Sequence, residues 1–127
     1  MCRSVYVTLC IYTRNSLAHS SIEEMIGLEP TRTSKKNDLY GWFISTQCST
    51  NSKDINDHLK LLISIIDRGG RFFEIQRKKE YQCRIMAFWE SESGNGGPVL
   101  HPETMRTIAD LNLELHFDIW LDLPDQH

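Results

Sequence analysis

The sequence predicts an α+β fold in which a four-stranded sheet carries about three helices on one face and leaves the other face partly open. Three observations support this fold class. Strand-like and helix-like patterns alternate from one end of the chain to the other. The expected strands alternate apolar and polar residues, whereas strands covered on both faces read as continuous apolar runs. No linker rich in Pro, Gly or Ser divides the 127 residues, so we expect a single domain over residues 1–127.

The first part of the chain is expected to form two strands with a short helix between them. Val5–Tyr12 alternates as a strand should, and Tyr40–Thr46 is expected to be the second strand. The helix is expected to begin at Ser21, whose hydroxyl can cap it while Glu24 reaches back to complete a capping box. Gly27 can adopt the left-handed conformation that ends a helix, so this helix is predicted to be short.

The second helix has the strongest local signals in the chain. Asp54 can cap its first turn, and the Gly69-Gly70 pair ends it. Between them, apolar residues recur at helical spacing: Ile55, Leu59, Leu62, Ile63 and Ile66. The following stretch, Arg71–Glu80, is compatible with either a helical turn or a loop.

The C-terminal part is expected to form a strand, a helix and a final strand. The third strand is Tyr81–Trp89, and Pro102 suits the first turn of a helix that Asn112 ends. The glycine-rich segment at 93–98 opens no helix directly, so it lacks the context of a phosphate-binding loop. The last strand, Leu113–Asp122, has the clearest alternation of period two, and its apolar side is expected to lie in the core: Leu113, Leu115, Phe117, Ile119 and Leu121.

Charge is divided unevenly along the chain, whose formal net charge is −3. Residues 1–89 carry thirteen Lys and Arg against nine Asp and Glu, whereas residues 90–127 carry one against eight. An acidic C-terminal part is a poor surface for nucleic acid and can steer a basic protein partner, although a solvated chain end would have the same composition. The longest apolar stretch, Leu61–Ile66, is far shorter than the ~20 residues that span a membrane. We therefore expect neither a nucleic acid nor a membrane as partner.

The four cysteines indicate a protein that stays in the cytoplasm. They are scattered (Cys2, Cys10, Cys48 and Cys83), with no C-x-x-C pair and no histidine at zinc-finger spacing. The N-terminus runs directly into the first strand and has no secretory signal pattern. We expect neutral thiols, no metal and no cofactor.

The sequence contains no recognised catalytic motif, so we expect the protein not to be an enzyme. His58, His101 and His116 are each more typical of a structural or solvated histidine than of a general base, because no positioned partner is signalled. A catalytic site built from His116, Asp118 and Glu90 is a weaker alternative.

Two features can carry a binding function. The basic turn Thr31, Arg32 and Thr33 could hold a phosphate or could simply connect two elements. The polar face of the last strand presents Trp120 among ionisable residues, which is typical of an interface anchor unless another segment covers it. Arg84, Met86 and Phe88 would extend this surface if the third and last strands are neighbours. The residues predicted to bind a partner are Glu90, Glu92, Glu114, His116, Asp118, Trp120 and Asp122.

The order of these motifs resembles a small bacterial domain-of-unknown-function family, family 4279. The resemblance covers roughly residues 4–122, and it rests on four segments: Ile26–Thr33 ("I-G-L-E-P-T-R-T"), Tyr40–Ser45 ("Y-G-W-F-I-S"), Asp54–Ile66, and Leu111–Trp120 ("L-N-L-E-L-H-F-D-I-W"). Asn112 stands where the family usually has Gly, and Trp120 stands where Tyr is common. Ser34–Asn37 replaces the typical aromatic-basic-Gly turn, which weakens a ligand-binding interpretation of that turn.

The resemblance implies a single α+β domain without established enzymatic activity, of a kind that looks like the immunity proteins of polymorphic antibacterial toxins. We therefore expect a cytoplasmic immunity protein that binds one cognate toxin domain as a monomer in a one-to-one complex. It would occlude the active site or the target surface of a toxin such as an ADP-ribosyltransferase or a nuclease. The alternative is a small ligand-binding or regulatory module that uses the Arg32 turn.

Overall fold

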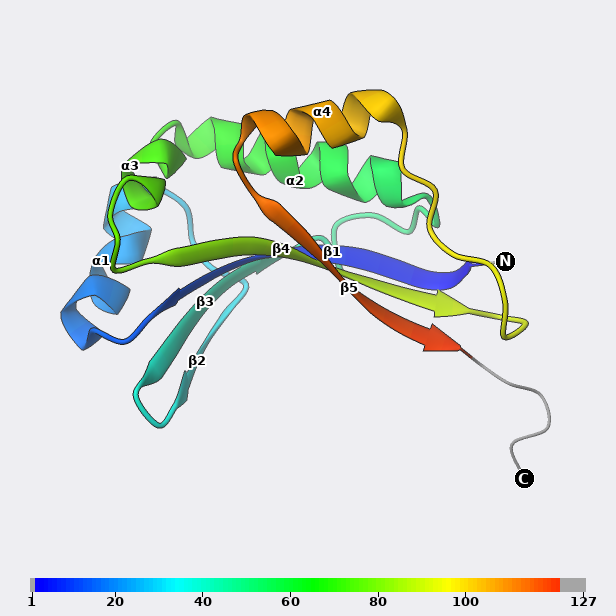
Figure 1. Cartoon of the computed structure of the whole chain (residues 1–127). Helices are drawn as coiled ribbons and strands as arrows, with labels where there is room; N and C mark the ends of the chain where they lie inside the picture. Colours follow the sequence, from blue (N-terminus) through cyan, green and yellow to red (C-terminus); the bar gives the residue numbers. More distant parts are fainter. Residues whose placement is uncertain (1, 122–127) are drawn as a thin grey trace.

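The computed structural model describes residues 2–121, which form a five-stranded sheet and four helices (Figure 1). The strand order is β2-β3-β1-β4-β5; all neighbours are antiparallel except β4 and β5, which are parallel. The elements in chain order are β1 (Cys2–Thr13), α1 (Ser16–Ile26), β2 (Arg32–Lys36), β3 (Leu39–Ser45), α2 (Ile55–Gly69), α3 (Phe72–Gln76), β4 (Gln82–Ser91), α4 (Pro102–Asp110) and β5 (Glu114–Leu121).

The helices lie on one face of the sheet and leave the other face open, as predicted (Figure 1). The core lies between the two layers. Val7, Leu9 and Ile11 of the central strand β1 are completely buried there, and Leu59 and Leu62 of α2 are completely buried opposite them. Each such side chain contributes about 1.5–3 kcal/mol by its removal from water, so this layer of apolar side chains dominates the stability of the fold.

The predicted capping residues of α2 and the predicted start of α4 are confirmed. These predictions depend only on residues that are neighbours in the sequence. The carboxylate of Asp54 accepts a hydrogen bond from the backbone N–H of Asn56, and Gly70 ends α2 with a positive φ of 71°. The hydrogen bonds from Asn56 also lower the pKa of Asp54. Pro102 occupies the first turn of α4. The ambiguous stretch after α2 contains the short helix α3.

The predicted start of the first helix is wrong. The side chain of Asn15 accepts hydrogen bonds from the N–H groups of Leu17 and Ala18, so the cap of α1 is Asn15 and not Ser21, six residues earlier than predicted. Ser21 lies inside the helix, where its hydroxyl donates to the carbonyl of Leu17 at 2.9 Å. Asparagine caps at least as well as serine, and here one residue, Arg14, separates it from the end of β1. Gly27 ends the helix as predicted, with a φ of 73°.

A fifth strand, β2, occupies the segment that the sequence suggested was a turn. Arg32–Lys36 pairs with β3 through a tight hairpin in which Asn37 has a positive φ of 58°. The strand has no apolar alternation because it lies at the edge of the sheet and is largely exposed. Lysines on an edge strand discourage pairing with other chains. The polar residues that made the strand unrecognisable in the sequence therefore also reduce its tendency to pair with another chain.

The apolar side of β5 is the main correction. Leu113 is buried and Leu115 is half-buried, as predicted, but Phe117, Ile119 and Leu121 are 43%, 41% and 50% exposed. β5 is the other edge strand, and its C-terminal half runs out from under α4 (Figure 1). The helical layer therefore covers only the beginning of this strand. No helix in the described part of the chain is long and apolar enough to cross a membrane.

We expect iodoacetamide at neutral pH to modify Cys48 in the folded protein and to leave Cys83 intact. All four cysteines are free; Cys48 is exposed, whereas burial raises the pKa of Cys83 to about 12. The thiolate is the reacting species, so Cys83 reacts only after unfolding. Peptide mapping by mass spectrometry, with a guanidinium-unfolded sample as control, checks this. Equal modification of the two cysteines in the native protein would contradict it.

Candidate functional site

The open face of the sheet carries the residues that the sequence singled out. In the register of β1, β4 and β5, Tyr6, Phe88 and Asp118 form one row across the strands. Glu90 and Trp120 are paired in the next row. The rings of Tyr6 and Phe88 stack with their centroids 4.9 Å apart, which gives this end of the sheet a rigid apolar floor.

We call this group the acidic-aromatic patch; it comprises Tyr6, Met86, Phe88, Glu90, Asp118 and Trp120. Trp120 is 59% exposed and Asp118 is exposed, whereas Glu90 is half-buried with an oxygen 3.8 Å from a guanidinium nitrogen of Arg3. The expectation that β4 extends the surface of β5 is confirmed, since Met86 pairs with His116 and Phe88 with Asp118.

Strand β5, which contributes Asp118 and Trp120 to the patch, has exposed side chains on both of its faces. Trp120 projects on the open side, while Phe117, Ile119 and Leu121 are exposed on the helix side. β5 also has no neighbouring strand on its outer side among the described residues. A long apolar edge strand is a ready template for pairing with another chain, unlike the lysine-bearing edge at β2.

A second group of side chains crosses the opposite end of the open face. The Arg32 guanidinium lies 4.1 Å from the centre of the Phe43 ring, and the Arg84 guanidinium lies 5.0 Å from the centre of the Tyr12 ring. The two rings meet edge to face, with centroids 5.7 Å apart. Gly41 leaves room for the Phe43 ring, because a Cβ at position 41 would come within 2.5 Å of that ring.

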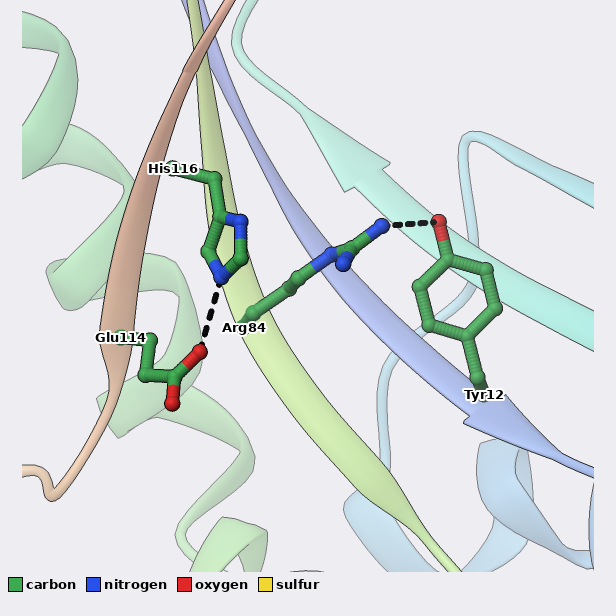
Figure 2. A network of polar contacts seen from close by, with 4 residues as sticks. All are labelled: Tyr12, Arg84, Glu114 and His116. Atoms are coloured by element: carbon green, nitrogen blue, oxygen red, sulfur yellow. Dashed lines mark hydrogen bonds and ion pairs between the residues drawn. The ribbon is translucent and has the colours of Figure 1, made fainter.

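Arg84 points away from the acidic residue beside it in the sheet. Figure 2 shows its guanidinium reaching across β1, where Nη2 lies 3.5 Å from the hydroxyl of Tyr12. Glu114 is its register partner on β5, but the carboxylate of Glu114 lies 2.8 Å from Nε2 of His116. Two hollows, of about 620 and 700 Å³, adjoin Arg84 and share Tyr12 and Gln82 as lining residues.

The structure brings most of the predicted partner-binding residues together. Glu90, Glu114, His116, Asp118 and Trp120 share the open face of β4 and β5. Two others are not placed with them: Glu92 is exposed in the loop after β4, and Asp122 lies outside the described residues.

The weaker catalytic alternative gains no support from the geometry. The ring of His116 contacts Glu114 and not Asp118, and neither hollow beside Arg84 is lined by His116, Asp118 or Glu90. His58 is buried, with its two ring nitrogens 2.7 Å from the Thr46 hydroxyl and 2.7 Å from the Ser52 carbonyl. Within residues 2–121, no three His, Cys, Asp or Glu side chains form a group that could hold a metal ion.

The residues of the supposed basic turn do not form a cradle. The hydroxyl of Thr31 accepts a hydrogen bond from the backbone N–H of Ser45 at 2.9 Å. Arg32 stacks on Phe43, and Thr33 follows in the strand, where successive side chains point to opposite faces. The turn expected here is therefore corrected to an edge strand whose arginine covers an aromatic ring.

Sequence reasoning missed the arrangement around Tyr12 and Arg84. Tyr12 ends the first predicted strand, and Arg84 lies in the first half of the third predicted strand, so nothing local relates them. The signal that could have found them is an aromatic residue and an arginine, each on the polar side of a predicted strand, but it acquires meaning only once β1 and β4 are known to be neighbours.

Comparison with known proteins identifies one family. A family model described as "Domain of unknown function (DUF4279)" matches residues 3–122. No curated protein and no solved structure matches the chain.

Proposed function

The chain belongs to the DUF4279 family of domains of unknown function, and from this premise we propose that it is a protein-binding domain that serves as the immunity protein of an antibacterial toxin. It would act in the cytoplasm as a monomer that binds one toxin domain in a one-to-one complex.

The exposed edge strand β5 is the observation that supports this proposal. Four large apolar side chains lie exposed on eight consecutive residues of β5: Phe117, Ile119, Trp120 and Leu121. A contiguous apolar surface of this kind is typical of an interface, and a tryptophan within it is typical of a residue that dominates binding energy.

The free edge of β5 offers a specific mode of binding. A strand of the partner can add to β5 and form main-chain hydrogen bonds, while its alternate side chains contact the two faces. On the open face it would meet Asp118 and Trp120, and on the helix side Phe117 and Ile119. The matching strand would carry basic residues on one side and apolar residues on the other.

The charge of the patch indicates what kind of toxin surface it would cover. Toxins that act on nucleic acids or on nucleotide cofactors have basic clefts, because their substrates are anionic. Asp118 and Glu90 would face such a cleft, which agrees with a nuclease or an ADP-ribosyltransferase as target. Binding there would occlude the toxin's active site or the surface that recognises its target.

The experiment co-expresses the protein with each candidate toxin domain found in the genes adjacent to its own, and it is scored by cell survival and by isolation of a complex from purified proteins. Survival together with a one-to-one complex supports the proposal. A toxin that kills equally with and without this protein, and forms no complex with it, would overturn the proposal.

Asp118→Lys is expected to slow association with a basic toxin by about tenfold at low salt and to flatten its salt dependence, because a charge steers encounter at long range. Stopped-flow or surface-plasmon measurements at several ionic strengths check this. Asp67→Lys is the matched control. Asp67 is exposed on α2, on the helix side of the sheet, and its substitution changes the net charge by the same amount as Asp118→Lys. An equal effect of both variants would assign the steering to net charge and not to the patch.

The alternative, a ligand-binding or regulatory module that uses Thr31, Arg32 and Thr33, has less support. Arg32 is engaged by Phe43, and the three residues lie along an exposed edge and not around a hollow.

A further inference from the structure

We propose that the hollow beside Arg84 binds a small molecule through a phosphoryl or carboxylate group. We call it the Arg84 hollow; it measures about 620 Å³, and its lining includes Tyr12, Arg14, Lys79, Gln82 and Arg84. It lies at the end of the open face opposite the acidic-aromatic patch, and the proposal is independent of toxin binding.

Three cationic side chains from separate segments converge on the Arg84 hollow. Arg14 follows the end of β1, Lys79 lies in the connection between α3 and β4, and Arg84 belongs to β4. Glu80 is the one acidic residue that lines it among residues 2–121. The hollow thus has an excess of positive charge in a chain whose net charge is −3, and a concave surface lined by one sign of charge concentrates the field that attracts an anion.

The guanidinium of Arg84 still has donors to offer. Its Nη2 lies 3.5 Å from the Tyr12 hydroxyl, which is the limit of hydrogen-bonding distance, and its Nε is buried without a hydrogen-bond partner among the described residues. Glu114, the carboxylate beside it in the sheet, is bonded to His116. The terminal guanidinium nitrogens are the donors that a ligand in the hollow can reach, and an oxyanion there would form charge-assisted hydrogen bonds with them.

The surroundings of Arg84 suit a compact oxyanion. The Arg84 guanidinium lies 5.0 Å from the centre of the Tyr12 ring, and a planar guanidinium matches the paired oxygens of a phosphoryl or carboxylate group. The volume falls in the range of about 300–1,000 Å³ that is usual for small-molecule sites. The adjoining hollow of about 700 Å³, on the side of Leu113 and Glu114, offers room for the remainder of the ligand.

The test titrates the purified full chain with pyrophosphate and, separately, with citrate, by isothermal calorimetry and by the shift in melting temperature at constant ionic strength. We expect saturable binding of at least one probe. Binding of pyrophosphate alone would assign a phosphoryl ligand, binding of citrate alone a carboxylate ligand, and binding of both the shared oxyanion chemistry. Binding of neither would overturn the proposal.

Variants locate the binding. Arg84→Gln is expected to weaken it about tenfold or more, and Lys79→Gln, at an exposed position that carries no core contact, is expected to weaken it in the same direction. Arg68→Gln removes an exposed arginine of α2 that lines neither hollow and is expected to bind like the wild type. Should Arg84→Gln fail to fold, Lys79→Gln decides. Wild-type affinity in Lys79→Gln and Arg84→Gln, or an equal loss in Arg68→Gln, would overturn the assignment.

Discussion

Leu59→Ala is expected to lower the free energy of unfolding by about 2–5 kcal/mol, because it leaves a cavity in the core. Leu59 is completely buried in α2 and faces the central strand β1, where Val7 and Leu9 are also completely buried. Collapse of neighbouring side chains into the cavity is restricted, since the sheet holds these residues in register. Urea unfolding followed by circular dichroism measures the loss.

Phe117→Ala is the informative comparison, because the sequence alone places Phe117 in the core and predicts a loss of roughly 3–5 kcal/mol. The side chain is 43% exposed, so we now expect a loss of about 1–1.5 kcal/mol. A loss as large as that of Leu59→Ala would mean that something covers this side of β5 in solution. Repeating the unfolding at several protein concentrations would show whether a second copy is responsible.

Trp120→Ala is expected to weaken binding of the toxin by about 2 kcal/mol or more, which is about thirtyfold in the dissociation constant. The side chain is 59% exposed in the free protein, so the partner would remove a large apolar area from water. The free energy of unfolding should fall by about 1 kcal/mol, comparable to the loss for Phe117→Ala, because the unexposed part of the side chain is already removed from water. Calorimetric titration measures the affinity, and unfolding in urea confirms that the variant is folded.

Leu17→Ala is the matched control, since Leu17 is 76% exposed on α1, away from β5. It should leave the affinity unchanged. If Trp120→Ala binds as tightly as the wild type, β5 is not the interface. The immunity proposal would then depend on another surface, such as the loop after β4 that carries Glu92.

The sequence by itself determined the elements whose signals are local. Asp54 caps the start of α2 and Gly70 ends it. Gly27 ends α1, and Pro102 begins α4. Such signals can be read from the sequence because a capping or terminating residue acts on backbone groups within one turn of itself. The alternation of β5 was equally visible, because the period of a strand is written in adjacent residues. These signals were enough to predict an α+β domain with one open sheet face.

Only the tertiary structure decided which residues of these elements are covered. Phe117 and Leu9 read alike in an alternating strand, but Leu9 lies in the central strand beneath α2, and Phe117 lies in an edge strand beyond the end of the helical layer. Burial depends on what packs against a face. That is a property of segments far apart in the chain, so no local pattern can report it.

The same reason separates the two sites. The acidic-aromatic patch was partly predictable because Asp118 and Trp120 alternate along one strand. The Arg84 hollow was not, because Tyr12 and Arg84 are 72 residues apart and meet only through the pairing of β1 with β4. Strand register, set by the packing of the whole core, brings such residues together, and the sequence around either residue carries no trace of the other.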